Sequence, residues 1–150
     1  AVGWAGAADS LAILVFAVAY LWLAVRDFMG RRGWFGIAVT AFFLLMVVVG
    51  AHQMSVAMPE LGANAGYIAL WALILGWGIA MLPVRRATGR GLLVAAGVLA
   101  VSIAARMADQ PWCAAWPMGT HWIWHCLNAV VLGWLIEVRR RHLAGQGAGG

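Results

Sequence analysis

Two histidines in the run His121-Trp-Ile-Trp-His125 have the spacing of a metal-binding pair on a helix. Residues four apart in an α-helix lie on one face, so the two imidazoles can bind the same ion. Helical zinc sites use such a pair of ligands. The sequence therefore predicts Zn²⁺ at His121 and His125, with the alternative that both histidines only pack within the fold.

A catalytic zinc site, which keeps one coordination position open for water or substrate, needs at least one further protein ligand. His52 is the third candidate ligand, because the remaining histidine, His142, lies in a basic tail. The alternative for His52 is an imidazole solvated by lipid headgroups. Asp9 is the candidate catalytic residue, since a carboxylate beside a metal-bound water can orient it and take its proton. The alternative for Asp9 is a cap on the first helix.

Other polar side chains allow two interpretations each. Ser55 and Ser102 either donate hydrogen bonds to a substrate or bond the backbone of their own helices. Arg106 and Asp109 are three residues apart, which favours an ion pair at a helix end. Asn64 precedes an apolar segment and is the expected N-cap of that helix.

The composition decides which solvent surrounds these residues. Of the 150 residues 65% are hydrophobic and only 10% are charged, whereas soluble domains average about half and a quarter. Lipid must therefore cover much of the surface. The formal charge of +5 comes from arginines in short clusters between apolar segments. Such clusters are topology signals, and they indicate no nucleic-acid partner.

Five apolar segments predict the fold class, an all-α membrane protein with five transmembrane helices. Open strands are excluded in lipid, because their backbone groups would lack hydrogen bonds. The first and fourth segments are shorter than the roughly 20 residues that cross a bilayer, so we expect their helices to extend into the polar flanks. One domain covers residues 1–142, followed by a Gly/Ala-rich disordered tail at 143–150. The segments are about Ser10–Val25, Trp34–Ala51, Ala65–Val84, Gly91–Ala105 and Thr120–Val138.

The arginine clusters predict the orientation. They occupy the first loop, the third loop and the C-terminal flank, which we expect on the cytoplasmic side of a bacterial inner membrane. Asp27 and Glu137 lie among these arginines and are expected to pair with them. The candidate site residues then all fall at the opposite, outer leaflet. The clusters are Arg26 with Arg31 and Arg32, Arg85 with Arg86 and Arg90, and Arg139 to Arg141.

A resemblance to a known family rests mainly on the last helix. Arg106-Met-Ala-Asp109, then Cys113, then Trp116-Pro-Met-Gly-Thr-His121-Trp-Ile-Trp124-His125-Cys-Leu-Asn128 resembles the last-helix signature of the alkaline ceramidase family. Bacterial ceramidase-like membrane proteins show the same run. The segment Ala8-Asp9-Ser-Leu-Ala-Ile13 looks like that family's third helix, and Asn64-Ala-Gly-Tyr67 like the start of its fifth. The resemblance extends to about Arg141.

The resemblance implies a function as well as a fold. The chain would be the C-terminal five helices of a seven-helix, zinc-dependent membrane hydrolase that cleaves the amide bond of a lipid such as ceramide. His121 and His125 correspond to two zinc ligands, and Asp9 to the aspartate near the zinc-bound water. A helix with the family's Ser-xxx-His motif is expected before Ala1. The family's proline soon after the aspartate is replaced here by Ala12.

Two alternatives belong to other functional classes. One is a haem-binding helical bundle, with His52 and a histidine of the fifth segment as axial ligands. Two histidines four apart on one helix cannot bind opposite faces of one haem, and a visible absorption spectrum would separate the two cases. The other is a catalytically inactive receptor or structural protein of the same fold. The sequence predicts a membrane lipid as partner and leaves the oligomeric state open.

The orientation is testable with a reporter fused after His142. Because arginines flank the last apolar segment on that side, the reporter should be active only in the cytoplasm. The measurement compares alkaline phosphatase activity with fluorescence of a fluorescent-protein fusion, because these two reporters give opposite readouts. Activity of the periplasmic reporter at this position would reverse the topology and with it the outward-facing site.

Overall fold

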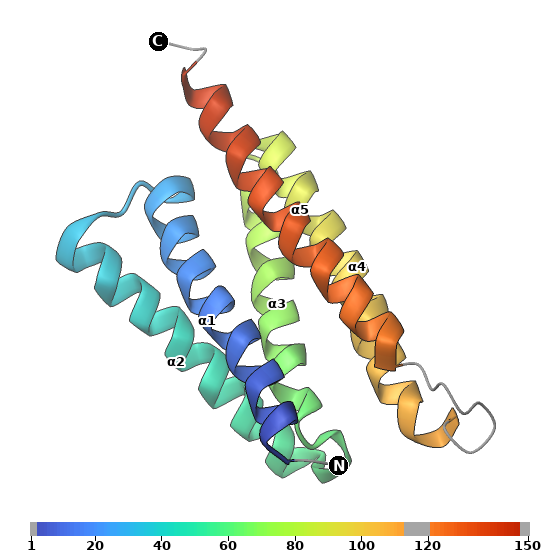
Figure 1. Ribbon diagram of the computed structural model, residues 1–150. Helices are drawn as coiled ribbons and strands as arrows, with labels where there is room; N and C mark the ends of the chain where they lie inside the picture. The colour runs from blue at the N-terminus through green and yellow to red at the C-terminus, as the bar shows by residue number, and fades with distance from the viewer. Residues whose placement is uncertain (1–2, 113–120, 148–150) are drawn as a thin grey trace. The chain divides into compact units, whose positions relative to one another are not determined.

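The computed structural model of the protein describes residues 3–112 and 121–147. The regular secondary structure of these residues consists of helices joined by short turns, with no strand (Figure 1). Four of the five α-helices have 25 to 27 residues, which is about 40 Å of helix. The elements are α1 Gly3–Phe28, α2 Gly33–Ala57, the 3₁₀ turn η1 Pro59–Leu61, α3 Asn64–Met81, α4 Arg86–Trp112 and α5 His121–Gly147.

Four of these helices contain stretches long and apolar enough to cross a membrane. They are Leu11–Phe28, Gly33–Ala57, Asn64–Met81 and Arg86–Asp109. The expected extension of the first and fourth segments into their polar flanks is confirmed, because α1 and α4 run well beyond residues 10–25 and 91–105. The multi-pass membrane character predicted from composition agrees with these helices. Among the described residues, α5 contains no stretch that meets the same length and hydropathy limits.

The C-terminal helix is longer than the sequence indicated. The disordered tail was expected from residue 143, but α5 continues to Gly147. Exposed ion pairs lie in its C-terminal half, where Glu137 accepts hydrogen bonds from Arg140 and Arg141 at 2.6 and 2.7 Å. Such pairs three and four residues apart support a helix in water. The expected pairing of Glu137 with arginines is thereby confirmed.

The chain divides into two compact units, residues 1–46 and residues 47–150, and α2 runs across the division. In the first unit Gly30 and Gly33 have φ of 64° and 60°, and they make the turn that joins α1 to α2. Arg26 donates to the Asp27 carboxylate at 2.7 Å, as predicted for that acid. Gly36 approaches the turn so closely that a Cβ there would lie 2.6 Å from the Arg31 carbonyl oxygen.

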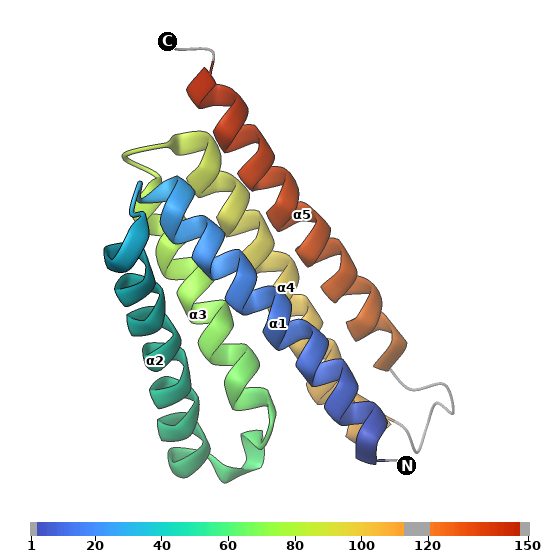
Figure 2. The ribbon, with the colours of Figure 1, turned by 60° about the vertical axis from the view of Figure 1, so that its left-hand side comes forward.

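In the second unit α4 packs against both α3 and α5, and the three helices lie side by side in both ribbon views (Figure 1 and Figure 2). Buried positions recur at alternating intervals of four and three residues, the pattern of helices that cross at a shallow angle. On α4 one such set is Thr88, Leu92, Ala95, Leu99 and Ser102, and Gly89, Gly91, Ala96 and Ile103 are buried as well; on α5 the set is Trp124, Asn128, Val131, Leu135, Val138 and His142.

Glycine lets α4 approach α3 within backbone contact. A Cβ on Gly89 would lie 2.7 Å from the Leu82 nitrogen and 2.8 Å from the Gly78 carbonyl oxygen. Farther along, the Trp71 indole donates to the Ala96 carbonyl at 3.0 Å. In lipid, helices gain little from the hydrophobic effect and associate through such close contacts and hydrogen bonds.

Gly89→Ala should therefore destabilise the α3–α4 contact. Overpacking of this kind costs about 1–3 kcal/mol, because the atoms in the way are backbone atoms. Gly97→Ala is the matched control: it lies on the same helix and a Cβ there meets nothing within 4 Å. The measurement is unfolding in mixed detergent micelles followed by circular dichroism. Equal stability of the two variants would contradict the close approach.

Candidate functional site

Polar side chains gather at the end of the second unit where α3 begins, α4 ends and α5 begins. These three helix ends lie together in both ribbon views (Figure 1 and Figure 2). Arg106 is the one arginine of α4's C-terminal half, and the residues just before it, Ile103 to Ala105, are apolar. Asn64 and Tyr67 belong to the first turn of α3, and Trp124 and His125 to the first turns of α5.

Arg106 is held by side chains of two other helices. Its Nε donates a hydrogen bond to Asn64 Oδ1 at 2.9 Å. Its guanidinium carbon lies 5.0 Å from the centre of the Tyr67 ring and 4.4 Å from the centre of the Trp124 ring. The two rings meet edge to face, with centres 5.8 Å apart. A planar cation against two aromatic rings is well placed for cation–π attraction.

The predicted role of Asn64 as an N-cap is wrong. The residue before the helix is Ala63, and no side chain caps the first turn of α3. Asn64 instead uses its side-chain oxygen to accept the hydrogen bond from Arg106. A cap bonds a backbone N–H of its own helix, whereas the guanidinium offers a charge-assisted donor, which makes a stronger hydrogen bond.

A second polar contact joins α4 to α5 farther from the helix ends. Ser102 is fully buried, and its hydroxyl donates to Asn128 Oδ1 at 2.9 Å and lies 3.3 Å from the Trp124 carbonyl oxygen. Asn128 is 8% exposed, and its amide nitrogen has no hydrogen-bond partner within the described residues. Of the two serines singled out in the sequence, Ser55 bonds its own helix, at the His52 carbonyl, and Ser102 bonds across helices.

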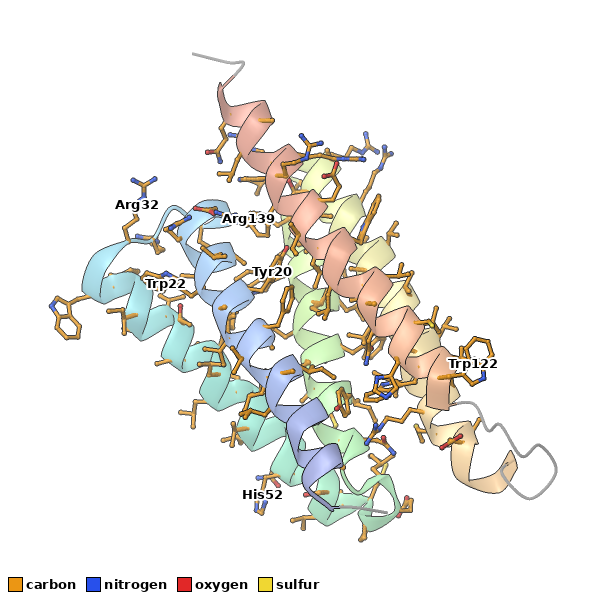
Figure 3. All side chains as sticks on the ribbon, in the orientation of Figure 1. Tyr20, Trp22, Arg32, His52, Trp122 and Arg139 are labelled. Carbon is orange, nitrogen blue, oxygen red and sulfur yellow. The ribbon has the colours of Figure 1, made fainter. Side chains whose placement is uncertain are left out.

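The three candidate zinc ligands differ in how much of each the structure describes. His125 is exposed and its ring lies 4.4 Å from the Trp124 ring, so the ring that holds Arg106 also contacts the histidine. Residue 121 starts α5 one turn before His125, and the side chain of His121 is outside the described residues. His52 is exposed near the end of α2 and is labelled in Figure 3. Convergence of these three side chains stays a prediction.

Asp9, the candidate catalytic residue, lies on α1 in the first unit, and its side chain is outside the described residues. Its proximity to the histidines likewise stays a prediction. Among the side chains that are described, no three of the kind that bind metals form a group.

A pocket of about 350 Å³ opens beside Arg106. Its polar lining consists of Glu60, Asn64, Arg106 and Asp109, and Leu61 and Met107 supply apolar surface. The guanidinium uses Nε for Asn64, which leaves its terminal Nη groups as donors for an oxygen-rich ligand. Sequence reasoning expected a helix-end ion pair at Arg106. The sequence feature that could have indicated a wider role for Arg106 is its position, because it is remote from the three arginine clusters that set the topology.

Comparisons of the chain with protein-family models, with curated proteins and with solved structures find no match.

Arg106→Gln should lower the free energy of unfolding by about 2 kcal/mol, because it removes the hydrogen bond to Asn64 and two cation–π contacts. Tyr67→Phe is the control: it keeps the ring beneath the guanidinium and should change stability by less than about 0.5 kcal/mol. Both are measured by unfolding in mixed micelles. A destabilisation by Tyr67→Phe equal to that of Arg106→Gln would mean that the ring contact is not what holds the arginine.

Proposed function

We propose that the protein is a zinc-dependent membrane hydrolase that cleaves the amide bond of a lipid such as ceramide. The observation that carries this function is the register of His121 and His125 at the start of α5. They are one helical turn apart, beside a cluster of polar residues from α3 and α4. Two imidazoles on one helical face are suited to zinc, and the exposed ring of His125 is accessible to an ion.

In this proposal the histidines bind the metal ion and the aspartate transfers protons. His121 and His125 would hold the ion, and His52 is the third candidate among this chain's histidines. Zinc bound there would supply a Lewis acid and an acidified water. The Asp9 carboxylate would accept a proton from the attacking water and orient it toward the lipid amide. The same carboxylate could then return that proton to the leaving amine.

Several features of α5 favour its role as the fifth span. Val130 and Ile136 are more than half exposed, as side chains that face lipid would be. Trp122, labelled in Figure 3, is half exposed near the start of the helix, where an interfacial tryptophan is expected. The arginines at the other end of α5 give the cytoplasmic C-terminus that we propose. Lipid chains would then have direct access to the His121–His125 end from the bilayer.

Arg106 fits this function as a contact for the polar part of the lipid. It lies on the helix end beside His125's neighbour Trp124, and it borders a pocket that is open to ligands. Its side chain is fixed before any ligand arrives, so little further entropy would be lost on binding. An amide lipid carries hydroxyl and carbonyl oxygens, which accept hydrogen bonds from a guanidinium.

His121→Ala or His125→Ala should abolish zinc binding or weaken it severely, and lipid-amide hydrolysis should stop. Asp9→Asn should keep zinc bound while hydrolysis collapses, because the carboxylate acts on the water and is not a ligand. Metal content and hydrolysis of a fluorescent ceramide are measured on the same purified samples. Cys126→Ser is the control: this exposed thiol adjoins His125 and should affect neither quantity.

Full hydrolysis by His121→Ala would refute the mechanism, whatever the topology. A loss of zinc in Asp9→Asn would make the aspartate a ligand in place of a base. His52→Ala separates the candidates for the third ligand: a drop in zinc content as large as that of His125→Ala would assign His52 to the ion.

A further inference from the structure

At the opposite end of the second unit, a pocket lies between the start of α4 and the C-terminal half of α5. Its volume is about 340 Å³, within the range of small-ligand sites. The two helix ends are neighbours in both ribbon views (Figure 1 and Figure 2). Arg90 and Arg141 line it together with Glu137, and Trp134, Val94 and Val138 form apolar walls.

The floor of this pocket is a close contact between the helices. The Trp134 indole donates to the Gly91 carbonyl at 2.8 Å. A Cβ on Gly91 would lie 2.6 Å from a methyl of Val138, so the helices touch there. The pocket is therefore built by tertiary packing, and its apolar walls are held in place.

The basic side chains are positioned in different ways. Arg141 donates through Nε to Glu137 at 2.7 Å, and its guanidinium lies 5.4 Å from the centre of the Trp134 ring. That arrangement fixes the arginine and leaves its Nη groups for a ligand. Arg90 is exposed and has no hydrogen-bond or ion-pair partner among the described residues. Glu137 is shared with Arg140, so the lining keeps a net positive charge.

One side of the pocket is closed by a buried histidine. His142 is 6% exposed, its Nδ1 lies 2.8 Å from the Thr88 hydroxyl, and its Nε2 lies 2.7 Å from the Gln146 amide nitrogen. Both ring nitrogens are thus engaged, and the contact joins the first turn of α4 to the last turns of α5. The histidine serves the shape of the pocket, and the arginines supply its charge.

We propose that this pocket binds the phosphate headgroup of an anionic phospholipid. Its depth suits that ligand, because it lies where the apolar stretches of α4 and α5 give way to arginines. Guanidinium groups bind phosphate oxygens through paired, charge-assisted hydrogen bonds. Valine and tryptophan walls offer a surface for the glycerol and the first acyl carbons. Basic pockets between transmembrane helices are a recurrent form of lipid headgroup site.

This site requires α4 and α5 to span the bilayer, but it does not depend on hydrolysis or on zinc. The two ends of the helices would then have separate tasks. One end would hold the chemistry, and the other would anchor the pair of helices to a charged leaflet.

The test measures lipid selectivity in reconstituted phosphatidylcholine bilayers that contain traces of spin-labelled lipid. The fraction of immobilised phosphatidylglycerol is compared with that of phosphatidylcholine. We expect a preference for phosphatidylglycerol, and a loss of about tenfold for Arg90→Gln, because charge-assisted hydrogen bonds to the phosphate are removed. Arg141→Gln should act similarly. Arg85→Gln is the matched control, an exposed arginine close to the same helix end that does not line the pocket; because its charge is screened by salt and makes no hydrogen bond in the pocket, it should change the preference less than about twofold.

Equal losses from Arg85→Gln and Arg90→Gln would overturn the pocket and leave only diffuse surface charge. No preference in the unmodified protein would overturn it as well. A third arm adds inorganic phosphate against chloride of the same ionic strength. Persistence of the preference supports a lipid ligand, whereas specific displacement by phosphate would reassign the site to a free anion.

Discussion

The close approach of α4 to its two neighbours is the constraint on which the second unit depends. Gly89 brings its backbone against that of α3, and Gly91 brings it against Val138 of α5. From these points toward the C-terminal end of α4, buried positions alternate every four and three residues, so the contact persists along the helix. Where lipid is the solvent, apolar side chains gain nothing from leaving it, and close contact becomes the main attraction. The polar features at both ends are placed by this packing.

At the end with the histidines, the packing of three helices stabilises a cation that lies near lipid. An unpaired arginine at such a depth is costly. Arg106 is stabilised by one hydrogen bond that it donates to Asn64 and by two aromatic rings, each from a different neighbouring helix. Trp124 contacts both Arg106 and His125, so the arginine and the proposed zinc ligand share a support. A change in the rotation of α5 would move both together.

The two ends of α4 and α5 differ in the kind of polar contact they contain. Toward the histidines, a single guanidinium contacts one amide and two aromatic rings, and the carboxylates of Glu60 and Asp109 line the adjoining pocket. Toward the C-terminus, several arginines surround one carboxylate and an apolar wall, which suits the boundary with anionic headgroups. Buried links of Ser102 with Asn128 and of Thr88 with His142 tie α4 to α5 near each end. Sliding one helix along the other would break both links, so the ends are held in a fixed relation.

The sequence by itself determined the helices, because each depends on a local run of apolar residues bounded by polar ones. It also determined the ion pairs of Asp27 and Glu137, whose partners are near in the chain. The register of His121 and His125 follows from helix geometry in the same way. Tertiary structure decided that Asn64 serves Arg106 in place of its own helix, and that Ser102 bonds Asn128. Those partners are 42 and 26 residues apart, and which side chains meet depends on how each helix is rotated about its axis. Apolar helices carry little pattern to reveal that rotation, since lipid and protein interior are similar solvents for the same side chains.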